Sequence, residues 1–124
     1  MAEIKKQPGQ GRSVARLGAV QALYQMELSD AQPDEVIKEF VAHRIGQEIE
    51  GDAYAEADRA HFKWLVLNTH SRIDELDSCI GSALDADWTV TRLGALMRAL
   101  LRAAAAELSA RPDIPARVVM NEYV

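Results

Sequence analysis

Apolar residues recur at three- and four-residue steps through most of the chain, which is the spacing of one face of an α-helix. The first such stripe consists of Val14, Leu17, Val20, Tyr24 and Leu28. Residues 1–11 before it are polar and contain proline and glycine, so we expect a flexible arm there. Ser13 has a hydroxyl that suits the first position of a helix, and the pattern therefore predicts a helix starting at that residue.

Two further helices are predicted in the middle of the chain. Pro33, followed by two acidic residues, suits the first turn of one helix. A break is expected between Gly46 and Asp52, and Asp58 can cap the helix that follows it. The longest clean apolar pattern covers Phe62 to Ile80 and predicts one helix of about five turns.

The last third of the chain predicts two more helices. A connector at residues 85–89, with Trp88 as an aromatic plug, precedes a strongly apolar helix between Leu93 and Leu108. The alanines at 103–106 would let a neighbouring helix approach closely. Two prolines in Arg111–Pro115 prevent helix continuation, and Pro115 can start a final helix.

These patterns add up to an all-α fold, a bundle of about five helices with short connections. Its 124 residues fit one domain. We divide the chain into a basic arm at 1–11 and a helical domain at 12–124. Because an apolar helix still runs at the last residue, we expect this domain to be C-terminally incomplete.

Composition indicates a soluble protein, with 48% hydrophobic and 27% charged residues. No apolar run approaches the roughly 20 residues that span a bilayer, and no secretory signal follows the basic N-terminus. The single cysteine, Cys79, cannot form an intrachain disulfide, and we expect it to be a buried, inert thiol. A cytoplasmic location without membrane contact follows as the expectation.

Charge is unevenly distributed along the chain. The formal net charge of -5 by itself argues against nucleic-acid binding, which needs Lys and Arg. Residues 4–26, however, hold four basic side chains and no acidic one, whereas acidic residues dominate 27–58. Two interpretations stay open: a solubilising tail before an acidic surface, or a local anion-binding surface hidden by the total.

No catalytic or metal-binding pattern is present in the sequence. His61 and His70 lie nine residues apart, which does not place them on one helix face. The carboxylates around Glu75 lie near Arg72 and suit a solvated face or a partner contact better than acid–base chemistry. Trp64 and Trp88 are expected in the core. The residues thus indicate a helical binding module with a basic N-terminal face, without an enzyme site, a metal or a cofactor.

Three stretches resemble the NusB transcription antitermination family. Arg12 to Arg16 leads into AVQALYQMEL, as the family's arginine-rich first helix does. Trp88 to Leu108 is similar to the family's Trp-Ser-Leu-x-Arg-Leu pattern and the helix after it. Asp113 to Val124, DIPARVVMNEYV, resembles the family's Asp-Ile/Val-Pro segment. Phe62 to Ile80 also resembles a family helix, so the resemblance covers nearly all of residues 12–124.

The resemblance implies a NusB-like helical bundle, in which two small helical subdomains pack into one domain. It implies a transcription antitermination factor that binds boxA RNA of ribosomal RNA operons together with NusE, a small-subunit ribosomal protein. Both would act in an antitermination complex on RNA polymerase. Neither a cofactor nor catalysis is implied, and a homodimer is possible.

The resemblance also implies two sets of site residues. The positions that match the family's RNA surface are Arg12, Arg16, Asp113 and Arg117. The polar face expected to contact NusE consists of Asn68, Arg72 and Glu75.

Two other functions remain as alternatives. The chain could be the NusB-like RNA-binding module of an RNA cytosine methyltransferase, which would place a long catalytic domain after the helices. It could also be a structural helical protein that self-associates through an exposed apolar face.

Overall fold

The computed structural model describes residues 10–43 and 53–123, in which all regular structure is helical. This confirms the all-α fold class. The elements are α1 (Gln10–Ser29), α2 (Pro33–His43), α3 (Ala53–Ser71), α4 (Ile73–Ala83), the short 3-10 helix η1 (Val90–Arg92), α5 (Ala95–Ala110) and α6 (Ala116–Tyr123). None of the helices described is both long enough and apolar enough to cross a membrane.

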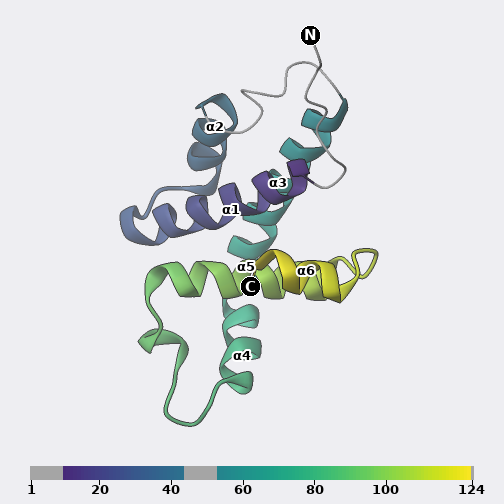
Figure 1. Cartoon of the computed structure of the whole chain (residues 1–124). Helices are drawn as coiled ribbons and strands as arrows, with labels where there is room; N and C mark the ends of the chain where they lie inside the picture. Colours follow the sequence, from purple (N-terminus) through teal and green to yellow (C-terminus); the bar gives the residue numbers. More distant parts are fainter. Residues whose placement is uncertain (1–9, 44–52, 124) are drawn as a thin grey trace.

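The helices form two groups (Figure 1), and their buried apolar side chains make one core. Helix α1 packs against α2, α3 and α5, while α5 also contacts α3, α4 and α6. Phe40 of α2 stacks on Phe62 of α3, with ring centroids 5.8 Å apart. Helices α1 and α5 therefore connect the α1–α3 group to the α4–α6 group.

Helix α1 buries Val20 of the predicted apolar stripe but leaves the other four members largely exposed: Val14, Leu17, Tyr24 and Leu28. Leu17 and Leu28 of that stripe are 61% and 64% exposed. The buried side of α1 is instead made mainly of small residues, with Ala15, Ala19 and Ala22 fully buried. Short side chains allow the backbones of α3 and α5 to approach α1 closely. Both faces are apolar, so periodicity did not distinguish them.

Helices α1 and α3 approach each other closely at Gly11. A β-carbon at this position would lie 1.5 Å from Oδ2 of Asp58, which is buried within α3. The prediction that Asp58 caps a helix is therefore wrong, because α3 begins five residues earlier at Ala53. Ser13 likewise lies inside α1 and does not cap it, since α1 begins at Gln10.

The single helix predicted over Phe62–Ile80 is two helices. α3 ends at Ser71, Arg72 adopts a non-helical backbone (φ −118°, ψ 21°), and α4 starts at Ile73. Leu76 and Ile80 of α4 are still buried, so the apolar spacing runs on through the bend. The apolar periodicity indicates which side of a helix faces the core, but it does not reveal a break of one residue between two helices.

Several local predictions have clear outcomes. The alanine run of α5 is packed as expected, with Ala103 and Ala106 fully buried, and α6 starts directly after Pro115. Two expectations are wrong: Cys79 is exposed, and Trp88 is 49% exposed with the Arg92 guanidinium 5.1 Å from its ring centre. The predicted break at Gly46–Asp52 and most of the arm lie outside the described residues.

Candidate nucleic-acid interface

A buried carboxylate of α5 contacts side chains of α1, α3 and α6. Glu107 of α5 is fully buried and accepts two hydrogen bonds of 2.8 Å from the Arg16 guanidinium of α1. The hydroxyl of Tyr123 in α6 donates to the same carboxylate at 2.6 Å. His61 of α3 places its Nε2 atom 3.4 Å from Glu107 Oε2. Arg16 also donates to Glu122 of α6 at 2.9 Å. We name these five residues the Glu107 cluster.

The electrostatics of the Glu107 cluster follow from these contacts. Burial by itself would raise the pKa of the Glu107 carboxyl, but the contacts with His61, Arg16 and Tyr123 lower it to about 2. Burial, together with the adjacent carboxylate, raises the pKa of the Tyr123 phenol above its ordinary value. Glu107 is therefore ionised and Tyr123 is protonated at neutral pH, which suits a fixed structural joint.

A second set of charges is exposed or half-exposed and comes from the loop between α5 and α6 and from the starts of α1 and α6. Arg111 pairs with Asp113 at 2.9 Å, and its guanidinium lies 5.3 Å from the ring centre of Trp64. The hydrogen bond from Arg111 lowers the pKa of the Asp113 carboxyl, and the positive charge of Arg12 adds to this effect. The start of α1 lies beside α6, since the Ser13 hydroxyl donates to the Glu122 carboxylate at 2.5 Å. We name Arg12, Arg111, Asp113 and Arg117 the arginine rim.

The four residues expected at an RNA surface fall into two environments. Arg12 is half-exposed, and Asp113 and Arg117 are exposed, with Arg117 in the first turn of α6. Arg16 differs, because its side chain is 6% exposed and is bonded to Glu107 and Glu122. In this conformation the Arg16 guanidinium is bonded to the two carboxylates and is not accessible to a phosphate. Its contacts link α1 to α5 and α6.

Sequence reasoning missed Glu107, Tyr123 and Arg111. A signal for Glu107 was present, since it is a lone acid on the apolar helix α5 directly after four alanines. A charge in such a position requires a buried partner. Nothing in the spacing identified Arg16 or Tyr123 as that partner, because they lie 91 and 16 residues away.

The polar face expected to contact NusE is one connected group at the bend between α3 and α4. Arg72 donates to Asn68 at 3.1 Å and pairs with Glu75 at 2.7 Å. It also donates to Ser109 of α5 at 3.1 Å, which ties the bend to α5. Glu75 is 67% exposed by its side chain, so part of this group faces outward.

Comparisons with known proteins agree with this architecture. The transcription antitermination protein NusB of Sinorhizobium fredii is 47% identical over 113 residues, which cover 91% of this chain and 71% of that protein. The protein of the same name from Rhodopseudomonas palustris is 48% identical over 113 residues, covering 91% of this chain and 67% of the relative.

A solved structure shares the fold. A chain in the crystal structure of a plectonemic RNA supercoil matches with a TM-score of 0.74 and 30% identity, over 92% of this chain and 77% of that one. The curated relatives are named as transcription antitermination proteins and not as enzymes, in agreement with the non-enzymatic expectation. Residues 13–124 match the NusB family, and the chain belongs to that family.

Proposed function

We propose that the protein is a transcription antitermination factor that binds boxA RNA of ribosomal RNA operons together with NusE. The observation that carries the proposal is the joining of α1 to α6 through Arg16, Glu107 and Glu122. In this proposal the start of α1, which these contacts hold against α6, and the Asp113 loop that leads into α6 together supply the charges that meet the RNA. The complex would act on RNA polymerase, which places the protein in the cytoplasm.

In this proposal the members of the arginine rim have separate roles. Arg12 and Arg117 contact phosphates, because they are cationic and accessible. The Asp113 carboxylate fixes the Arg111 guanidinium, whose planar group can also stack on an unpaired base. Arg16 is a positioning residue that holds α1 in place without touching RNA.

A titration of labelled boxA RNA tests this proposal. We expect Arg12→Gln and Arg117→Gln each to weaken binding, and Lys38→Gln on the exposed side of α2 to leave it unchanged. Adding NusE should tighten the wild-type complex. Equal binding of boxA and a scrambled RNA of the same length would contradict the proposal, as would equal losses from all three substitutions.

NusE would contact the face of Asn68, Arg72 and Glu75. A second surface competes for this role: the exposed apolar row on α1, which contains Leu17, Tyr24 and Leu28. Exposed apolar patches mark protein interfaces. We expect Glu75→Lys to abolish NusE binding and Leu17→Ser to leave it intact. The reverse result would place the NusE contact on α1 and contradict its assignment to the face of Asn68, Arg72 and Glu75.

Self-association is the alternative that the α1 row also supports. If the row pairs two copies, light scattering of the free protein should show a dimer that Leu17→Ser converts to a monomer. The methyltransferase alternative has less support, because the similar curated relatives are named as antitermination proteins.

A further inference from the structure

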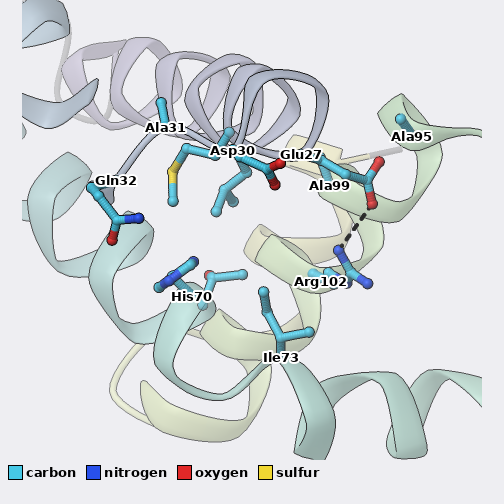
Figure 2. Close-up of a pocket in the computed structure, with 12 residues that line it drawn as sticks. Glu27, Asp30, Ala31, Gln32, His70, Ile73, Ala95, Ala99 and Arg102 are labelled. Carbon is cyan, nitrogen blue, oxygen red and sulfur yellow. Dashed lines mark hydrogen bonds and ion pairs between the residues drawn. The ribbon is translucent and has the colours of Figure 1, made fainter. Parts of the chain in front are cut away.

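The arginines that line two hollows of the described surface have their charges matched. Figure 2 shows one of these hollows, between α1, α3 and α5, where Arg102 is joined to Glu27. A neighbouring hollow at α4 and η1 also contains Arg98, which pairs with Glu27 at 2.7 Å, while Arg102 pairs with Asp77 at 2.7 Å. The guanidinium groups of these hollows are therefore already paired within the molecule.

A groove between α2 and α3 has the opposite property. It has a volume of about 440 Å³ and combines aliphatic side chains with two lysines. Its lining consists of Asp34, Ile37, Lys38, Val41 and Ala42 of α2 and Lys63 of α3. Lys38 and Lys63 are both exposed, and neither forms an ion pair with any residue in the described ranges 10–43 and 53–123. The groove thus places two unmatched cations beside apolar surface.

The position of Lys38 is unusual for its part of the sequence. From Glu27 to Asp58 the chain has ten acidic residues and two basic ones, of which Lys38 is one. Asp34 lies in the first turn of α2, where a carboxylate stabilises the helix dipole. Two lysines and one aspartate give the lining a formal charge of +1, in a chain of net charge -5. The groove is therefore a local exception on an acidic protein.

A third cation lies close to the groove on α3. Arg59 precedes Lys63 by four residues, so both side chains are on the same side of the helix. Arg59 is half-exposed and likewise forms no ion pair with the part of the chain that the structure describes. Cations that are free to meet a partner thus come from both helices that form the groove.

We propose that this groove binds an acidic amphipathic helix of a partner protein. The aliphatic row of that helix packs on Ile37 and Val41, and its Asp or Glu side chains pair with Lys38 and Lys63. Helix α1 contacts α2 and α3 without lining the groove, so the added helix would complete a group of four. RNA suits the groove less well, because its phosphates match the lysines but offer no aliphatic row.

A synthetic peptide of about 20 residues, long enough to fold as a helix on binding, tests the proposal on the full chain. Its leucines recur at three- and four-residue steps, and glutamates border them. A second peptide has lysines in place of the glutamates, and a third has the composition of the first in scrambled order. We expect saturable amide NMR shifts at Ile37, Val41 and Lys63 from the first peptide only. Equal binding of the three peptides, or no shifts at these residues, would overturn the proposal.

Charge reversal in the groove supplies the matched variants. Lys38→Glu and Lys63→Glu should each weaken binding of the glutamate peptide at least about fivefold and strengthen binding of the lysine peptide. Tm should change little, because both positions are exposed. Arg117→Glu makes the same change of charge at an exposed position outside the groove and should alter neither affinity. Equal effects of Lys38→Glu and Arg117→Glu would show general charge attraction and overturn the site.

Other occupants of the groove would give different results. Competition between boxA RNA and the glutamate peptide would assign the groove to RNA. A dimer in light scattering that Lys38→Glu disrupts would assign it to a second copy of the chain. Either result would overturn the proposal, whereas unchanged RNA affinity of Lys38→Glu together with weaker peptide binding would support it.

Discussion

At Glu107 the protein keeps a carboxylate in its interior, where an unpaired charge would be very costly. Two hydrogen bonds from Arg16 and one from Tyr123 match this charge, and His61 lies close to it. A buried ion pair adds little stability compared with apolar residues, but removing one partner exposes the other to the full cost of burial. Single substitutions in the Glu107 cluster should therefore lower the stability of the fold strongly.

Glu107→Gln should lower the free energy of unfolding by about 3 kcal/mol, because Arg16 stays charged in a buried site. Urea denaturation measures the loss. In the Arg16→Met background the same substitution should lower the free energy of unfolding clearly less, because no buried cation is then left without a partner. Equal costs in the two backgrounds would mean that the two side chains are not coupled.

The lowered pKa of Glu107 also predicts a dependence of stability on pH. A carboxyl group whose pKa is lower in the folded state stabilises the fold above its unfolded pKa and loses this effect as the pH falls through the folded value. With a folded pKa of about 2, the contribution is roughly 3 kcal/mol at neutral pH. It should disappear between about pH 5 and pH 2.

The difference between wild type and Glu107→Gln isolates this contribution from other carboxylates, such as Glu27, whose pKa is lowered mainly by its hydrogen bond from Arg98. Thermal unfolding of both proteins across this range should show curves that converge at acidic pH. Parallel curves would contradict the role assigned to Glu107.

Between elements, small residues decide which face of α1 packs. Ala22 is fully buried, whereas Leu17 is 61% exposed. Ala22→Leu should destabilise the protein by about 1–3 kcal/mol through overpacking, while Leu17→Ala should change stability by less than about 0.5 kcal/mol. Chemical denaturation of the two variants provides the measurement. The opposite ranking would mean that the predicted stripe faces the core after all.

The crossing of α1 and α3 makes a similar prediction at Gly11. Alanine normally stabilises a helix relative to glycine by about 1 kcal/mol. Here its β-carbon would overlap Asp58, so Gly11→Ala should destabilise the protein by about 1–3 kcal/mol. Comparing Gly11→Ala with and without Asp58→Ala by denaturation tests the cause. The cost should shrink in the Asp58→Ala background, and an unchanged cost would exclude the clash.

Across the whole molecule, the contacts of Ser13 and Arg16 with Glu122 hold α1 against α6, and these two helices carry Arg12 and Arg117. If Arg12 and Arg117 each neutralise one RNA phosphate, each substitution to Gln should reduce the slope of log K against log salt by about 0.7. Binding measured at several salt concentrations gives this slope. Lys38→Gln is the control and should leave the slope unchanged. A weaker affinity with the original slope would indicate that the arginines act without phosphate contact.

Some of this architecture could be predicted directly. The apolar spacing showed that the chain is helical, and Pro33 and Pro115 marked where α2 and α6 begin. These features depend on interactions between residues close in sequence. The exposed Cys79 and Trp88 were predicted wrongly, because an apolar residue type indicates burial without saying which neighbours are available to provide it.

Periodicity, proline and short motifs are local properties, and they were enough to predict the helical class, most helix positions and the family resemblance. The packing of the helices settled which face of α1 is buried and where the Arg16 guanidinium lies, bonded to Glu107 and Glu122. It also joined Glu107 to Arg16 across 91 residues. These outcomes depend on which helices meet, and pairings between distant segments leave no periodic trace in one sequence.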